Sequence, residues 1–313
     1  MCSYNGSRYV DEQLKSIASQ IRLPDELVVC DDGSTDNTIS LLTAFAAESP
    51  FQVLVVSNEE RLGPAKNFEK AIRLCKGDII ALSDQDDIWK PQKLARLVLA
   101  LEEHPSAVYA FSDADFCDHE GSLLGYSLWD AVGLRNVIAH FTGSGQLAIL
   151  LRHNLIPGSA MVFRRPFMDV ILPIPADWMH DYWIVLLGST LFSGVPVSET
   201  LFMYRRHLEQ TLGWRKKTFM EVCKSSWMAG QDESWKKVTQ FQELQDRVQS
   251  VSYLIHCSPE NKNLLKQKEM HLVNRAEIRS ARGISRVFKV AAELATGRYG
   301  RFSNNWISVI RDL

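Results

Sequence analysis

Short apolar runs alternate with amphipathic segments through the first half of the chain. Apolar residues recur at helical spacing in four segments, at 10–21, 38–47, 65–74 and 90–103. Nearly continuous apolar runs, typical of buried strands, lie at 27–30, 51–57, 79–82 and 107–111. This alternation predicts an α/β fold with a mostly parallel sheet that is covered by helices on both faces.

The second half of the chain has a less regular pattern. It predicts a strand at 160–163, an apolar helix at 181–187 and a short strand at 199–204. From about residue 218 onward the pattern is mostly helical, with breaks at Ser258-Pro259 and near Gly297. We therefore expect an α/β domain over 1–210 and a mainly helical region over 211–313.

Two acidic clusters follow strands of the predicted sheet. Asp31-Asp32 follows the run at 27–30, and Asp84-Gln85-Asp86-Asp87 follows the run at 79–82. In parallel α/β sheets, ligands bind at the carboxyl ends of the strands. Both clusters therefore occupy a position that is typical of binding sites.

Asp84 and Asp86 stand two residues apart, so both carboxylates can converge on one cation. Mg²⁺ or Mn²⁺ prefers such oxygen ligands, and the phosphates of a substrate usually fill the remaining positions. A diphosphate leaving group then gains charge neutralisation as its bond breaks. The alternative is a solvated acidic loop that caps the next helix. For Asp31-Asp32-Gly33-Ser34, the alternatives are a polar turn and carboxylates that accept hydrogen bonds from a nucleobase or a ribose.

Two further polar clusters lie in the second half. Asp181 of His180-Asp181-Tyr182-Trp183 precedes an apolar helix, so it is either an N-cap or a general base for a hydroxyl group. Trp183 either offers a flat face to a sugar or packs in the core. In Tyr204-Arg205-Arg206-His207, the arginines suit a diphosphate and His207 suits a metal or a phosphate, with a surface loop as the alternative.

Composition limits the classes of function. The 313 residues are 46% hydrophobic and 23% charged, and the formal net charge of −2 argues against nucleic acid as a partner. None of the six cysteines belongs to a CxxC pair, so we interpret them as buried thiols of a reducing, cytoplasmic compartment. The polar start of the chain predicts no signal peptide, and no apolar stretch is long enough to predict a membrane span.

The C-terminal region is basic. From Glu260 to Leu313 the chain carries eleven basic and five acidic residues. These cations either belong to solvated helix faces or attach the protein peripherally to the anionic inner face of a cell membrane, where lipid-linked acceptors reside.

Six segments carry a combined pattern: Cys2 to Gly6, Val29 to Asp36, Asn58 to Asn67, Ser83 to Trp89, His180 to Trp183 and Tyr204 to His207. In this order they resemble family 2 glycosyltransferases, which are inverting enzymes of the GT-A fold, a mostly parallel Rossmann-like sheet. They look most like the rhamnosyltransferase-like branch that builds bacterial surface polysaccharides. The resemblance covers residues 1 to about 210.

This resemblance, together with the chemistry of the arginines, implies a set of donor-binding residues: Ser3, Tyr4, Asn5, Asp31, Asp32, Lys66, Asn67, Asp84, Arg205 and Arg206. Among these, Asp31 is implied to contact the nucleobase of the donor, with Asp32 beside it. Asp84 is implied to face the ribose or the metal.

The remaining assignments concern the metal, the base and the acceptor. Asp86 is implied to bind Mg²⁺ or Mn²⁺ together with Asp84, and His207 is the candidate third ligand. Asp181 is implied to be the catalytic base. His180 and Trp183 beside it are assigned to the acceptor.

The reaction implied by the resemblance is a single in-line displacement at the anomeric carbon, with inversion. The expected donor is dTDP-rhamnose or a UDP-sugar, and the expected acceptor is a saccharide or a lipid-linked saccharide. The family normally has a strand immediately before the segment that matches Cys2 to Gly6. We expect that strand to be missing here, which would expose neighbouring strand edges.

Two other functions share parts of this pattern. A nucleotidyltransferase would need a glycine-rich, basic phosphate loop near the start, which Ser7-Arg8 does not supply. A non-catalytic sugar-nucleotide-binding protein predicts donor binding without turnover. A dehydrogenase is disfavoured because no GxGxxG follows a strand.

Overall fold

The computed structural model describes residues 1–207, 231–303 and 305–313, and these residues form two compact units. The first unit holds 1–139, 155–188 and 192–207. The second holds 140–154, 189–191 and the described residues from 231 onward. The boundary expected near residue 210 lies outside the described residues.

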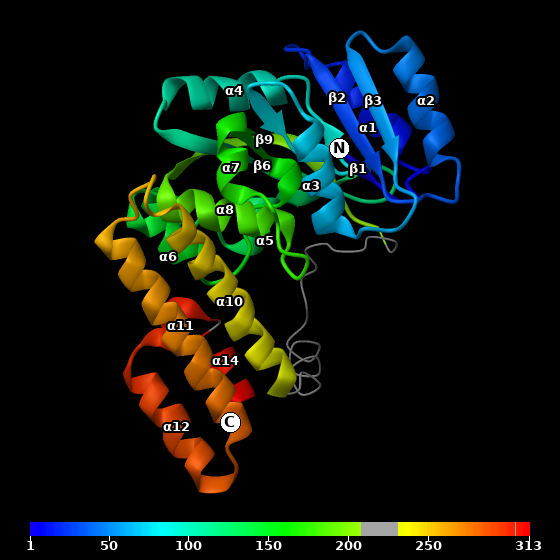
Figure 1. Ribbon diagram of the computed structural model, residues 1–313. Coiled ribbons are helices and arrows are strands. Elements are labelled where there is room, and N and C mark those ends of the chain that lie inside the picture. The colour runs from blue at the N-terminus through cyan, green and yellow to red at the C-terminus, as the bar shows by residue number, and fades with distance from the viewer. Residues whose placement is uncertain (208–230, 304) are drawn as a thin grey trace. The chain divides into compact units, whose positions relative to one another are not determined.

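A small parallel sheet in the order β1–β2–β3 opens the first unit (Figure 1). Cys2 pairs with Cys30 and Cys30 pairs with Val56, so the strands end together at one edge. On the other side of β1, the Cys2 N–H donates to the carbonyl of Ser83 at 3.2 Å, which brings the start of the long acidic run to this sheet. The bounds are β1 Cys2–Ser3, β2 Glu26–Asp31 and β3 Gln52–Ser57.

The second sheet of this unit is mixed, in the order β4–β8–β6–β9–β5, with β7 paired to β6. Among the described strands of this sheet, β6 and β9 run parallel and the other pairs run antiparallel. The predicted α/β class is confirmed, but the parallel arrangement is limited to the first sheet and the β6–β9 pair. The bounds are β4 Ile79–Ala81, β5 Ile88–Trp89, β6 Ala107–Cys117, β7 Leu123–Ser127, β8 Met161–Arg164 and β9 Ser193–Arg205.

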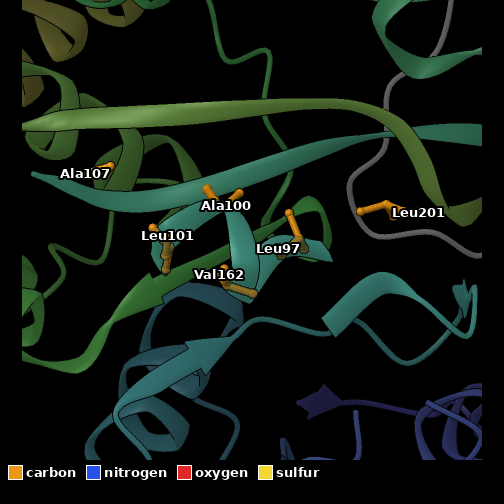
Figure 2. Close-up of a cluster of buried hydrophobic side chains, with 7 residues drawn as sticks. Leu97, Ala100, Leu101, Ala107, Val162 and Leu201 are labelled. Atoms are coloured by element: carbon orange, nitrogen blue, oxygen red, sulfur yellow. The ribbon is translucent and has the colours of Figure 1, made fainter. Parts of the chain in front are cut away.

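Amphipathic helices cover both sheets of the first unit. Ala71 of α3 packs on Val28 and Cys30 of the parallel sheet. Leu97 and Leu101 of α4 pack on the mixed sheet, in a cluster with Ala100, Ala107, Ala110, Val162 and Leu201 (Figure 2). The bounds are α1 Val10–Ala18, α2 Thr38–Glu48, α3 Pro64–Leu74, α4 Lys93–Glu103, α5 Leu128–Val132, α7 Met168–Ile171 and α8 His180–Leu191, the last three residues of which belong to the second unit. Short 3-10 turns lie at Ile138–His140, Gly158–Ala160 and Arg165–Phe167.

The second unit is helical, as expected for the C-terminal region, and α10 and α11 run side by side in it (Figure 1). The break predicted at Ser258-Pro259 is the start of α11, where the Ser258 hydroxyl accepts the Asn261 N–H at 3.1 Å. Ile278, Val290, Tyr299 and Val309 form an apolar cluster between its later helices. The bounds are α6 Ser144–Leu150, α10 Gln231–Val251, α11 Pro259–Ser280, α12 Gly283–Ala295, α13 Arg298–Phe302 and α14 Asn305–Asp312.

All eight elements predicted in the first 111 residues are present. The fourth helix begins at Lys93 rather than at residue 90, because Ile88 and Trp89 pair with Met203 and Phe202 as strand β5. In the part of the chain that the structure describes, no helix combines the length and the apolar character needed to cross a membrane.

Candidate active site

The carboxylates of Asp31 and Asp32, at the end of β2, are buried and fully supplied with donors. Asp31 accepts from the Ser3 hydroxyl at 2.8 Å and from the Ser34 N–H at 2.8 Å. Asp32 accepts from the Asn58 amide at 2.9 Å and from the N–H groups of residues 62 and 63 at 2.7 and 2.9 Å. These bonds fix the turn after β2 and the loop before α3, so both side chains already serve the fold.

Tyr4 and Asn5 lie beside this turn, as the donor-pocket prediction requires. The Asn5 side chain accepts the Thr35 N–H at 2.8 Å, and the backbone of Asn5 has a positive φ of 47°. The Tyr4 N–H donates to the Gln85 side chain at 2.8 Å, and the Gln85 amide donates back to the Tyr4 carbonyl at 3.1 Å. Gln85 therefore joins the first polar segment to the acidic run, a role that the sequence did not reveal.

Lys66 and Asn67 occupy different environments on the first turn of α3. Asn67 is buried, donates to the Cys30 carbonyl at 2.8 Å and accepts from Asn58 at 2.9 Å, so it ties α3 to β2. Lys66 is partly exposed, pairs with Glu69 at 2.8 Å and borders a cavity. Of the two, the structure leaves Lys66 in a position to meet a ligand.

The acidic run from Asp84 to Asp87 carries negative charge with few donors. Burial raises the pKa of Asp84 well above its usual range, and the charges of Asp87, Asp86 and Asp181 raise it further. Burial and the charge of Asp86 raise the pKa of Asp87 to about 7. The carboxylates of Asp86, Asp87 and Asp181 thus all lie within electrostatic reach of Asp84.

Residues 205–207, at the end of β9 and just after it, include two that contact this acidic run. His207 Nε2 lies 2.9 Å from Asp86 Oδ2, which brings two of the predicted metal ligands together. Arg206 reaches away and donates to the Tyr126 hydroxyl at 2.7 Å. Arg205 is buried; it donates to the Asp86 carbonyl at 2.9 Å and pairs with Glu12. Arg205 therefore braces the acidic run, in place of the diphosphate contact expected from the sequence.

Asp181 lies in the first turn of α8 with both carboxylate oxygens held by backbone donors. The Gly158 N–H donates to Oδ2 at 3.3 Å, and the Tyr182 N–H donates to Oδ1 at 2.6 Å. His180 beside it is buried and stacks on Phe68 with ring centroids 3.8 Å apart. Burial lowers the pKa of His180 to about 3, so the imidazole is neutral at physiological pH.

Trp183 belongs to the core and not to an acceptor surface. Its side chain is buried, and its indole N–H donates to the Ile171 carbonyl at 2.8 Å. The tryptophan that does face a cavity is Trp178. This cavity, of about 240 Å³, lies between residues 62–66 at the start of α3 and residues 176–180 before α8. Sequence spacing could not distinguish the two tryptophans, because both neighbour the same helix start.

Lys93 is a buried cation that the sequence analysis did not single out. Its side chain is fully buried, its ammonium donates to the Ser159 carbonyl at 2.5 Å, and it lies over the Trp89 and Phe202 rings at 3.9 and 4.2 Å. Burial lowers its pKa to about 7, although the charges of Asp87 and Asp84 oppose that shift. Lys93 therefore connects the acidic run to the 3-10 turn that holds Asp181.

The donor set near Asp86 fits a divalent cation. A carboxylate and an imidazole lie together at Asp86 and His207, and Asp84 adds a second carboxylate that lies within electrostatic reach of three others. Over the residues that the structure describes, however, no three such side chains converge in a preformed metal site. An arrangement of this kind suits an ion that the phosphates of a substrate help to coordinate.

The family described as glycosyl transferase family 2 matches residues 1–171, which is more than half of the chain. The chain belongs to glycosyl transferase family 2. The matched range includes both acidic clusters, whereas Asp181 and His207 lie beyond it.

Curated relatives of this family 2 chain are distant and mostly longer. An uncharacterized protein of Mycobacterium tuberculosis is 28% identical over 209 residues, which are 66% of this chain and 57% of that protein. The dTDP-rhamnosyl transferase RfbG of Shigella flexneri is 36% identical over 102 residues, 31% of this chain and 35% of that protein. The alignments thus span less than two thirds of the length of these relatives.

Solved structures of two transferases share the fold. The mannosyltransferase PcManGT of Pyrobaculum calidifontis, in complex with GDP-Man and Mn²⁺, has a TM-score of 0.55 at 18% identity and covers 99% of this chain and 84% of that chain. Residues 1–349 of TarS of S. aureus, in complex with UDP-GlcNAc, have a TM-score of 0.56 at 16% identity and cover 96% and 90%. These likenesses confirm the predicted GT-A class with its helical C-terminal region.

Proposed function

We propose that this protein transfers a sugar from a nucleotide-diphosphate donor to an acceptor hydroxyl, with inversion at the anomeric carbon. The observation that carries the proposal is the gathering of Asp84, Asp86, Asp87 and Asp181 within electrostatic reach in a family 2 chain. Two of these carboxylates, Asp84 and Asp86, suit a cation that neutralises the diphosphate, and Asp181 suits a proton acceptor. The donor and catalytic residues are proposed to belong to residues 1–210.

The donor is proposed to lie across the ends of β1, β2 and the acidic run. Ser3, Tyr4, Asn5 and Asp31 border the nucleotide, and Lys66 borders the cavity near the sugar. Asp84, Asp86 and His207 would hold Mg²⁺ or Mn²⁺, which when bound neutralises the diphosphate as it leaves. Gln85 keeps the nucleotide side and the metal side of the site in one arrangement through its two bonds to Tyr4.

Asp181 is proposed to remove the proton of the acceptor hydroxyl. As the acceptor oxygen forms its bond to the anomeric carbon, the bond from that carbon to the diphosphate oxygen breaks, and the proton passes to the Asp181 carboxylate. The N–H groups of Gly158 and Tyr182 hold this carboxylate in place before the acceptor arrives. The neutral His180 adds no positive charge beside the base.

The donor is proposed to be dTDP-rhamnose or a UDP-sugar. RfbG is by name a dTDP-rhamnosyl transferase, and the TarS structure holds UDP-GlcNAc. The cavity beside Lys66 has apolar walls from Leu62, Pro64 and Trp178, which suits the face of a sugar ring. The acceptor is proposed to be a saccharide or lipid-linked saccharide of bacterial surface polysaccharide synthesis at the inner face of the membrane.

Calorimetric binding of dTDP, UDP and GDP, with and without Mn²⁺, tests the donor site first. We expect one nucleotide to bind much more tightly when Mn²⁺ is present. Asp181→Asn then tests the base: we expect transfer to fall by roughly 100-fold or more, with nucleotide affinity unchanged. A folded protein that binds none of the three would contradict the proposal, and so would a variant that retains full transfer.

A further inference from the structure

Helix α12, in the second unit (Figure 1), has an apolar stripe that is exposed to solvent. Ile284, Val287 and Phe288 are 76%, 54% and 69% exposed. With the exposed Ala291 and Ala295 they stand at helical spacing, so they share one face. The opposite face is the one that packs in the unit, through Val290. Single exposed apolar residues are common, but a continuous stripe along a whole helix indicates an interaction surface.

The charges around the stripe are all positive. Within 282–295 the single acidic residue, Glu293, is buried and bonded to His271, Asn274 and Arg298. Arg282 is exposed, with no acidic partner among the described residues. Lys289 is also exposed and makes one surface ion pair, with Glu277 of α11. The helix therefore presents apolar side chains and cations to solvent, and no anion of its own.

We propose that α12 docks the second unit on an anionic lipid surface, with Ile284, Val287 and Phe288 inserted among the acyl chains and with Arg282 and Lys289 at the headgroups. An amphipathic helix with a large apolar face and cations beside it is the arrangement that lies in the plane of a membrane interface. Anionic headgroups complement the cations, and acyl chains remove the apolar stripe from water. The inference does not depend on the transferase activity.

A second copy of the chain is the other occupant that the stripe could take. A second copy packed stripe to stripe would offer Arg282 and Lys289 no exposed acid of its own α12, since that helix carries none. Like charges at such a contact oppose association. The charge pattern therefore favours the lipid surface.

Co-sedimentation of the full chain with vesicles tests this inference. We expect binding to phosphatidylcholine vesicles that contain phosphatidylglycerol, much weaker binding to phosphatidylcholine alone, and a decrease as salt is added. Ile284→Ser with Phe288→Ser should weaken binding about tenfold or more, because two exposed side chains no longer gain from insertion. Arg282→Gln with Lys289→Gln should weaken binding only to the anionic vesicles.

Tyr253→Ser is the matched control. Tyr253 lies in the same unit and is 79% exposed, but it is outside α12, so its loss should leave vesicle binding unchanged. Circular dichroism should show all variants folded, since every substituted side chain is largely exposed. Absence of binding, equal loss in the control, or a dimer that the serine variant dissociates would each overturn the proposal.

Discussion

The two acidic clusters of the active-site region look alike in sequence and differ in their surroundings. Asp31 and Asp32 receive hydrogen bonds from hydroxyl, amide and backbone donors, which belong to strand β1 and to the loops that follow β2 and β3. Around Asp84 the neighbours include three further carboxylates, which raise its pKa beyond the effect of burial, and Asp86 contacts only the His207 imidazole through its carboxylate in the bonds described above. The first cluster finds its hydrogen-bond partners within the protein, and the second is the one at which we propose that a cation binds.

This difference separates a structural acid from a ligand-binding acid. A carboxylate whose donors are all internal contributes to folding, and its removal leaves those donors unpaired. A carboxylate that is surrounded by like charge opposes folding, and its removal relieves repulsion at the expense of function. The two clusters should therefore respond to the same substitution with opposite changes in stability.

The largest effect is expected for Asp86→Asn. Loss of a ligand charge should lower transfer by roughly 100-fold or more and abolish the effect of Mn²⁺ on nucleotide binding. The unfolding free energy of the metal-free protein should stay the same or rise. Calorimetry with Mn²⁺ and urea unfolding measure the two halves of the prediction, with Asp11→Asn on the surface of α1 as control. Unchanged dependence on Mn²⁺ would refute the ligand assignment.

Asp32→Asn should show the reverse behaviour. The asparagine NH₂ group cannot accept the N–H bonds that Asp32 accepts from residues 62 and 63, so one or more buried donors lose their partner. We expect the unfolding free energy to fall by about 2 kcal/mol. Urea unfolding of this variant beside Asp86→Asn is the direct comparison. Destabilisation of both variants to the same extent would show that the two clusters do not differ in this way.

Lys93→Met tests the buried lysine that lies within electrostatic reach of Asp84 and Asp87 in the second cluster. The variant removes the bond to Ser159, next to Gly158 that holds Asp181, and also a positive charge near Asp87. We expect kcat to fall by roughly tenfold, because a small displacement of the base slows proton transfer. Steady-state kinetics with the pH dependence of kcat measure it.

The matched control is Lys268→Met in the second unit. Lys268 donates to the Phe302 carbonyl at 2.9 Å, and burial lowers its pKa to about 7, as for Lys93. Both substitutions remove an ammonium, fully buried at Lys93 and partly buried at Lys268, and one bond to a carbonyl, so both should lower the stability. Only Lys93→Met should change kcat. An equal loss of kcat in the two variants would mean that Lys93 acts through stability alone.

The smallest expected effect is on the pH dependence of the folding stability. The pKa of Asp87 is about 7 in the folded chain, raised by burial and by Asp86, against about 3.9 in an unfolded chain. The folded state thus holds a proton that the unfolded state releases, so the associated stability is present below pH 4 and is lost as the pH rises to 7. Thermal unfolding without divalent cation should show this decline, and Asp87→Asn should flatten it. A slope identical in the variant would assign the decline to other groups.

Local pattern was enough to predict the first sheet and its helices. Buried runs such as 27–30 and 79–82 end at acids, and the acidic clusters follow those strands as predicted. The mixed sheet was not predicted, because β8 and β9 pair with strands distant in the chain, and periodicity does not report pairing direction. The family, the fold class and the helical C-terminal region are confirmed, whereas the catalytic roles stay predictions.

Burial explains the errors among single residues. Arg205 and Trp183 carry chemistry suited to ligands, yet each is enclosed by groups from other elements: Glu12 and the Asp86 carbonyl for Arg205, and the Ile171 carbonyl for Trp183. Lys93 was not singled out from the sequence, because a lysine at a helix start is ordinarily exposed to water and makes no buried contact. Only the packed structure shows which polar side chains face inward.

The contact between Gly6 and Gln85 has a consequence for how such chains diverge. A Cβ atom at position 6 would lie 2.2 Å from Gln85 Oε1, so the amide that joins Tyr4 to the acidic run occupies the space of a missing side chain. A side chain at position 6 would have to displace the Gln85 amide, which would break the two bonds that join Gln85 to the Tyr4 backbone. Across related chains, the two positions should be inherited as a pair, and a larger residue at position 6 should accompany a shorter one at position 85.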